Sequence, residues 1–130
     1  MIINMKKETK KIILNLSNQV CFLDQPIHLL AVCTGGTKIA KIIKTDLNKR
    51  NIKSNVFEMW TDITNGKKIL RKTNFKKNDY IGTAVIIDDV IWNGTAIPCI
   101  KKYLKKLKRK KIYIAALFDV NKKADFAVYR

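Results

Sequence analysis

Two adjacent carboxylates, Asp88 and Asp89, are the residues in this sequence best suited to chemistry. They directly follow Val85–Ile87, an apolar triplet typical of a buried strand. The loop after them ends in four residues that precede an amphipathic segment: Asn93, Gly94, Thr95 and Ala96. Carboxylates at a strand end can accept hydrogen bonds from sugar hydroxyls, and backbone N–H groups at a helix N-terminus attract phosphate. The pattern indicates a sugar-phosphate site, although an acidic pair near an Asn-Gly turn also occurs in ordinary loops.

A second loop follows another apolar run. Residues 27–33 are almost entirely apolar, which is typical of a parallel strand buried on both faces, and Thr34-Gly35-Gly36-Thr37 ends the run. Loops at the carboxyl ends of parallel strands meet at one edge of a sheet, where ligands bind. We therefore expect four loops to converge at that edge: 33–37, 61–79, 88–95 and 119–125.

The rest of the chain alternates strand-like and helix-like segments. Apolar residues at helical spacing predict helices over 8–20, 37–50 and 96–109. Apolar runs predict strands over 27–33, 52–60, 83–88 and 112–118, with a short fifth strand over 125–129. Residues 61–80 are polar and basic, and we expect a mobile loop that could include a short hairpin. This alternation predicts one α/β domain spanning 1–130: three layers, with a mostly parallel sheet of four to five strands and helices on both faces.

The formal net charge is +17 over 130 residues, and most of the basic residues are lysine. Lysine is a point charge that suits phosphates better than base edges, so nonspecific binding to nucleic acid fits the composition better than sequence-specific reading. No apolar run is long enough to cross a bilayer and the N-terminus does not resemble a secretory signal, so we expect a cytoplasmic protein with no membrane partner. The three widely spaced cysteines favour neither a zinc site nor a disulfide framework.

With both loops in view, the chain resembles the type I phosphoribosyltransferases from about Ile27 to Tyr129. The segment Asp88–Ile97 is similar to the sugar-phosphate motif of the orotate enzymes. The Thr34-Gly35-Gly36 loop, Ala115–Phe118 and Ala124-Asp125-Phe126 look more like the small hypoxanthine, guanine and xanthine enzymes.

The resemblance implies transfer of a 5-phosphoribosyl group from phosphoribosyl pyrophosphate to a nucleobase, with a purine favoured, by a Mg²⁺-dependent homodimer active in nucleotide salvage. Asp88 and Asp89 would hold the ribose hydroxyls and Mg²⁺. The 5-phosphate would lie against Asn93, Gly94, Thr95 and Ala96. The pyrophosphate would lie against Thr34, Gly35 and Gly36, a loop that in this family often contains a non-proline cis peptide.

Other segments would complete the site by the same resemblance. Residues 61–79 would form a lid, from which Lys67, Lys68 and Arg71 are candidates to reach the pyrophosphate. Phe126 would stack on the base, and Lys122 would hydrogen-bond to its carbonyl. Residues 119–130 would form only a minimal hood over the base.

Trp92 departs from the family pattern, because purine members usually carry an aspartate there that handles a proton on the base. Trp92 would instead lie over the ligand or pack at a subunit contact, or else the base is not a purine. A regulator on this fold that binds the sugar phosphate, and RNA through its lysines, is the main alternative. A sugar-phosphate or nucleoside hydrolase is the other, and it would need Asp62 or Asp119 as a base or nucleophile.

Overall fold

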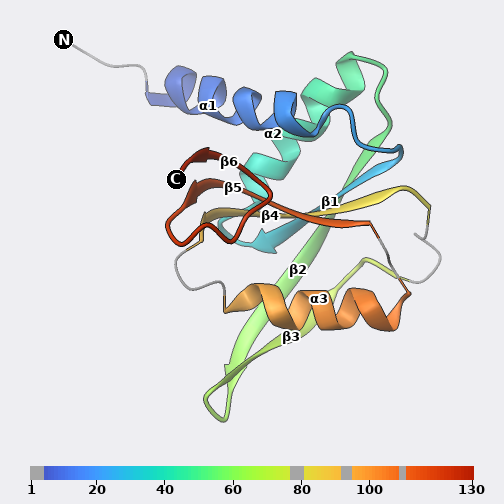
Figure 1. Cartoon of the computed structure of the whole chain (residues 1–130), viewed down its shortest axis with the longest axis vertical. Coiled ribbons are helices and arrows are strands. Elements are labelled where there is room, and N and C mark those ends of the chain that lie inside the picture. The colour runs from blue at the N-terminus through green and yellow to red at the C-terminus, as the bar shows by residue number, and fades with distance from the viewer. Residues whose placement is uncertain (1–4, 77–80, 92–94, 109–110) are drawn as a thin grey trace.

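Six strands form one sheet in the order β3-β2-β1-β4-β5-β6 (Figure 1). The computed structural model describes residues 5–76, 81–91, 95–108 and 111–130. Its elements are α1 (Met5–Val20), β1 (Ile27–Cys33), α2 (Thr37–Lys49), β2 (Ser54–Thr64), β3 (Lys67–Thr73), β4 (Thr83–Ile91), α3 (Ala96–Lys106), β5 (Ile112–Asp119) and β6 (Phe126–Tyr129). All neighbouring strands pair in parallel except β2 and β3, which form an antiparallel hairpin.

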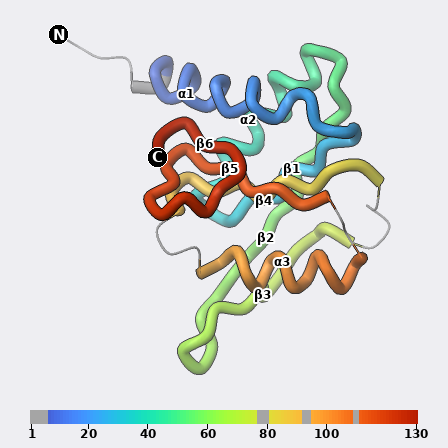
Figure 2. The backbone as a smooth tube through the Cα atoms, viewed as in Figure 1, coloured from blue at the N-terminus to red at the C-terminus, as the bar shows by residue number. Residues whose placement is uncertain are grey.

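Helices cover both faces of the sheet, which makes three layers. Figures 1 and 2 show α1 and α2 on one face and α3 on the other, with the β2–β3 hairpin running past α3. Alternate residues of the central strands enter two separate cores: Leu29 and Ala31 of β1 pack toward α1 and α2, whereas Leu30 and Val32 pack toward α3. Burial on both faces explains why β1 is apolar throughout rather than alternating.

The predicted architecture is confirmed, with one strand more than the four to five expected. The predicted helices and strands are all present with boundaries shifted by a few residues, and β1 has the predicted bounds. The additional strand is β3. Residues 61–73, expected to lie in a mobile loop with room for a short hairpin, instead continue β2 to Thr64, turn at Asn65-Gly66 and return as β3.

The C-terminal segment belongs to the sheet. Residues 119–130, expected to form a minimal hood, contain the turn after β5 and the edge strand β6, whose Ala127 carbonyl accepts a hydrogen bond from Gln19 of α1 at 2.9 Å. Within the described ranges, no helix is long and apolar enough to cross a membrane. Cys21, Cys33 and Cys99 are free and half-buried.

Candidate active site

A cavity of about 430 Å³ opens at the carboxyl ends of β1 and β4. Its walls come from four places: the loop after β1, the end of β4, the start of α3, and the hairpin. The residues that line it are Val32, Cys33, Thr34, Gly35, Thr61, Lys68, Asp88, Asp89, Val90, Ile91, Thr95, Ala96 and Ile97. The predicted convergence of the first three loops is therefore seen, and the two carboxylates are among the residues that line the cavity.

Asp88 is half-buried and faces α3, because it follows Ile86 at the two-residue spacing of a strand and Ile86 belongs to that core. Burial raises the pKa of Asp88 to about 7, and the hydrogen bond and charge of the Asp89 carboxylate add to the effect. The Asp89 backbone N–H, which donates to Asp88 Oδ1 at 2.8 Å, and the Lys68 ammonium act in the opposite direction. The pair would therefore be stabilised by a cation that shares its charge.

Asp89 points toward the loop after β1. Its Oδ1 accepts a hydrogen bond from the Val90 N–H at 2.8 Å. A Cβ added at Gly35 would lie 2.6 Å from the same oxygen, and one added at Gly36 would lie 2.1 Å from the Ile87 carbonyl oxygen. Both glycines are therefore required by close packing of this loop on β4. The Cys33–Thr34 peptide bond is cis, as the resemblance implied.

Two helices begin at this edge of the sheet. The N-cap of α2 is Gly36 and that of α3 is Thr95, and neither helix has an acidic residue in its first turn or a side-chain cap. The partial positive charge at each N-terminus is thus left for an anion. The acidic pair lines the same cavity as Gly35, which precedes α2, and Thr95, which precedes α3.

The hairpin contributes one basic residue to the cavity. Lys68 of β3 is half-buried and lines it, while Lys67 and Arg71 do not. An Arg71 guanidinium nitrogen instead lies 3.8 Å from an Asp62 carboxylate oxygen. Arg71 has no partner on β2, because the register shifts between Trp60, which pairs with Lys72, and Thr61, which pairs with Leu70. Of the three basic residues that we expected to reach a pyrophosphate, the geometry brings only Lys68 into the cavity.

The residues expected to hold a base lie elsewhere. Phe126 packs against Phe22 and Tyr113 on the α1 side of the sheet, with ring centroids 6.4 and 5.6 Å away. Lys122 is exposed in the turn after β5, with φ 54°, and does not line the cavity. Phe126 does not line the cavity that holds Asp88 either, and the expected contacts of both residues with a base stay predictions. Trp92, Asn93 and Gly94 lie outside the described residues.

An aromatic pair that the sequence analysis missed lies nearer the cavity. Phe118 of β5 and Tyr129 of β6 stack with centroids 5.0 Å apart and planes 19° apart, and each is more than 40% exposed. Phe118 pairs in register with Val90, which lines the cavity. Because paired residues of neighbouring strands point to the same face, Phe118 and Tyr129 share the face of Asp88. The sequence alone could not identify this pair, because the face that Phe118 and Tyr129 share depends on how β4, β5 and β6 pair.

The two other aspartates considered for hydrolysis have structural partners. Asp119 is 1% exposed, and its carboxylate accepts hydrogen bonds from the backbone N–H groups of Lys123 and Ala124 at 2.8 Å and from Arg130 at 3.2 Å. Asp62 accepts from the Ile63 N–H and faces Arg71. Neither lines the cavity, so the hydrolase alternative loses its candidate nucleophile or base.

Comparison with known proteins finds structural likeness without close sequence similarity. No protein-family model matches the chain, and no curated protein matches it. Among solved structures, a purine phosphoribosyltransferase from Pyrococcus horikoshii superposes with a TM-score of 0.74 at 22% identity, covering 95% of this chain and 83% of its own. A hypoxanthine phosphoribosyltransferase from Staphylococcus aureus gives 0.77 at 14% identity, covering 99% and 76%. A hypoxanthine-guanine phosphoribosyltransferase from Bacillus anthracis gives 0.73 at 16% identity, covering 95% and 77%. The chain therefore has the fold of the purine phosphoribosyltransferases.

Proposed function

We propose that this protein transfers a 5-phosphoribosyl group from phosphoribosyl pyrophosphate to a nucleobase and releases pyrophosphate. The observation that carries the proposal is one cavity lined by an acidic pair, by the loop before α2 and by the start of α3, two helix N-termini without a side-chain cap. Phosphoribosyl pyrophosphate has the matching pattern: a ribose with free hydroxyls between two phosphate groups. The acidic pair suits the hydroxyls, and each helix N-terminus suits one phosphate group.

We assign the two ends of the substrate from the resemblance to the type I phosphoribosyltransferases. The start of α3, at Thr95 and Ala96, takes the 5-phosphate, and the loop Thr34-Gly35-Gly36 takes the pyrophosphate. Lys68 lines the cavity, so that its ammonium can reach the leaving group. Asp88 and Asp89 accept hydrogen bonds from the ribose hydroxyls.

The carboxylates also fit Mg²⁺. The ion takes oxygen ligands, uses one or two protein carboxylates, and completes its shell with water and substrate phosphates. Burial and the Asp89 carboxylate raise the pKa of Asp88, and a cation that shares the charge of both carboxylates would favour their ionised forms. Within the described residues no cluster of three or more metal-binding side chains exists, so the substrate would have to supply the other ligands. Bound there, Mg²⁺ would neutralise charge on the departing pyrophosphate.

The rest of the chemistry needs positioning rather than a nucleophilic side chain. As the bond to pyrophosphate breaks, positive charge develops on the sugar carbon and negative charge on the leaving oxygens. In this arrangement the Asp88 and Asp89 carboxylates lie beside the sugar, and the Lys68 ammonium and the N–H groups of Thr34 and Gly35 lie beside the leaving group. The Gly36 N–H instead donates to the Val32 carbonyl oxygen at 2.8 Å. The incoming base nitrogen then attacks the carbon that these contacts hold in place.

A purine is the favoured base, because the similar solved structures include enzymes named for purines and hypoxanthine. The stacked pair Phe118 and Tyr129 replaces Phe126 as the candidate platform, since its exposed rings lie on the Asp88 face. Aromatic rings stack well on a planar base.

The proposal is tested by pyrophosphate release from phosphoribosyl pyrophosphate and Mg²⁺ against hypoxanthine, guanine, xanthine, adenine, orotate and uracil. We expect release that depends on one base or a small group of purines. Asp88→Asn with Asp89→Asn should abolish it, and calorimetry should show that the double variant no longer binds phosphoribosyl pyrophosphate. If the double variant binds phosphoribosyl pyrophosphate with unchanged Mg²⁺-dependent affinity, the assignment of the site is wrong. If the wild type binds without turnover, the protein is a sugar-phosphate-binding regulator.

A further inference from the structure

Helix α3 carries lysines in two rows on its surface. Lys101 and Lys105 form one row and Lys102 and Lys106 the other, each with i,i+4 spacing. This spacing repeats about every 6 Å along the helix. Like charges at i,i+4 destabilise a helix, and α3 contains no acidic residue to offset them. The rows therefore raise the free energy of the isolated protein unless an anion lies against them.

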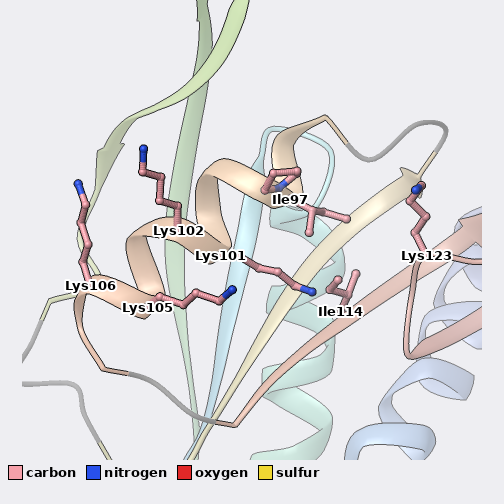
Figure 3. Close-up of a pocket in the computed structure, with 8 residues that line it drawn as sticks. Ile97, Lys101, Lys102, Lys105, Lys106, Ile114 and Lys123 are labelled. Atoms are coloured by element: carbon pink, nitrogen blue, oxygen red, sulfur yellow. The ribbon is translucent and has the colours of Figure 1, made fainter.

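The lysines surround a groove instead of a convex surface. A hollow of about 740 Å³ runs along α3 and is lined by Ile97, Pro98, Lys101, Lys102, Lys105, Lys106, Ile114 and Lys123. In Figure 3, Lys101 and Lys105 extend from α3 toward Ile114 of β5, and Lys123 lies across from them beyond Ile114. Positive charge thus reaches the groove from both sides of an apolar floor. The groove shares Ile97 with the cavity that holds Asp88.

These charges have no internal compensation. In the described part of the chain, the ion pairs join Arg50 to Asp46, Arg71 to Asp62, Lys111 to Asp24 and Arg130 to Asp119, so none involves a lysine of the groove. Of the described residues that line the groove, none is acidic.

A second lysine-lined hollow, between α1 and α2, provides a contrast. Its lining includes Lys10, Lys38, Lys41 and Lys49. It also includes Asp46, whose carboxylate accepts a hydrogen bond from Ser17 at 2.6 Å and pairs with Arg50 at 2.8 Å. That face therefore carries its own anion, whereas the α3 groove does not.

We propose that the α3 groove binds single-stranded nucleic acid through its phosphates. Lysine ammonium groups in rows suit successive phosphates of a backbone, and the absence of arginine from the described lining favours contact that does not depend on sequence. The lysines on both sides of the groove can contact the phosphates of one strand that lies in it, whereas a duplex would contact only the lysines at the edge of the groove. A second copy of this chain would bring the same positive charge and be repelled. This function is separate from the proposed transferase activity, because none of the groove lysines lines the cavity that holds Asp88.

The test is fluorescence anisotropy with a labelled 12-nucleotide oligouridylate, the matching single-stranded DNA, a duplex of equal length, and vesicles containing anionic lipid. The groove variant is Lys101→Gln with Lys105→Gln and Lys123→Gln. The matched control is Lys10→Gln with Lys41→Gln and Lys49→Gln, which removes the same number of charges from the opposite face. We expect single strands to bind more tightly than duplex or vesicles.

The groove variant should lose at least about tenfold in affinity, and its slope of log K against log salt should become shallower by about 2 units, the loss of three phosphate contacts. The control should lose less than threefold. Equal losses in the two variants would mean that net charge alone drives binding, and preference for duplex or vesicles would mean a different partner; each would overturn the proposal. Circular dichroism and thermal melting establish that both variants are folded, and single substitutions at Lys101 and Lys105 replace the triple variant if it is not.

Discussion

Asp89 and Gly35 lie in direct contact across the two loops of the candidate site: a Cβ at residue 35 would lie 2.6 Å from the Asp89 carboxylate. The contact ties the loop after β1 to the carboxylate pair that ends β4. The position of Asp89 therefore depends on the absence of a side chain at residue 35, in the loop that follows the neighbouring strand β1.

Gly35→Ala should therefore displace Asp89 and reduce function more than stability. The added methyl meets a side chain, which can rotate, and the φ of Gly35 is not in the left-handed region. We expect at least about a tenfold loss in kcat/KM for phosphoribosyl pyrophosphate, which corresponds to about 1.4 kcal/mol of transition-state binding. Steady-state kinetics and urea unfolding measure the two effects. Gly36→Ala is the matched contrast, because its methyl would meet the Ile87 backbone carbonyl at 2.1 Å and should chiefly lower stability. The same loss of stability in both variants would contradict this assignment.

Asp88 should make the stability of the free protein depend on pH. Burial and the Asp89 carboxylate raise its pKa to about 7, so between its ordinary pKa and 7 the folded state binds more protons than the unfolded state. The free energy of unfolding should then fall as the pH rises from 3.8 to about 7 and become level above that. Urea unfolding at pH 5.5, 6.5, 7.5 and 8.5 without Mg²⁺ measures this slope, and Asp88→Asn should flatten it. Added Mg²⁺ should reduce the slope, because the ion favours the charged carboxylate. A wild type and variant with parallel pH profiles would show that Asp88 titrates normally.

The sequence predicted the strand ends of the site better than the side chains around them. β1 and β4 are apolar runs buried on both faces, so their ends are visible without knowledge of the fold. The hairpin was only partly anticipated, although Asn65-Gly66 is a strong turn signal, because residues 61–64 are mostly exposed and polar and lack an apolar face. The face of the sheet to which Phe126 belongs could not be predicted from the sequence for a different reason. In a four-residue edge strand the pairing register decides which side chains face which core. A shift of one residue would turn Phe126 to the α3 face of the sheet and Tyr129 to the α1 face.

Lys68 and Lys67 should behave differently although they are neighbours. Lys68 lines the cavity and its charge lowers the pKa of Asp88, whereas Lys67 does not line the cavity. Lys68→Gln should raise the KM for phosphoribosyl pyrophosphate or lower kcat by about ten- to a hundredfold in total, the loss of one charge-assisted contact. Lys67→Gln should change kcat/KM by less than threefold. Kinetics of the two single variants with a saturating base decide the matter, and equal effects would mean that the hairpin moves during the reaction.

Asp119 should be essential for stability and not for chemistry. Its buried carboxylate accepts two backbone N–H groups of the turn before β6 and pairs with Arg130. Asp119→Ala would leave those N–H groups unpaired in a buried turn and should lower the free energy of unfolding by about 2 kcal/mol or more. The measurement is chemical denaturation, with Asp125→Ala as a comparison, because Asp125 is exposed and its side chain accepts one N–H, that of Ile114. A folded, fully stable Asp119→Ala protein without activity would instead return Asp119 to the list of catalytic candidates.

The Phe118 ring should contribute to binding of the base and not to binding of the sugar phosphate. Its ring stacks on Tyr129, is 44% exposed, and lies next to Val90 at the margin of the cavity. Phe118→Ala would remove one ring of this stacked pair, so we expect the KM for the base to rise by about two- to tenfold, the equivalent of one lost stacking contact. The KM for phosphoribosyl pyrophosphate should stay within twofold. Phe118→Tyr keeps a ring of similar area and should restore most of the affinity for the base.

The matched control is Phe126→Ala, whose side chain packs with Phe22 and Tyr113 on the other face of the sheet. It should lower the melting temperature while leaving the KM for the base unchanged in the folded fraction, because a half-buried ring in a core contact stabilises the fold only. If Phe126→Ala raises the KM for the base and Phe118→Ala does not, the base lies on the α1 side. The register of β6 would then have to differ from the one described here, since only a shift of one residue turns Phe126 toward Asp88.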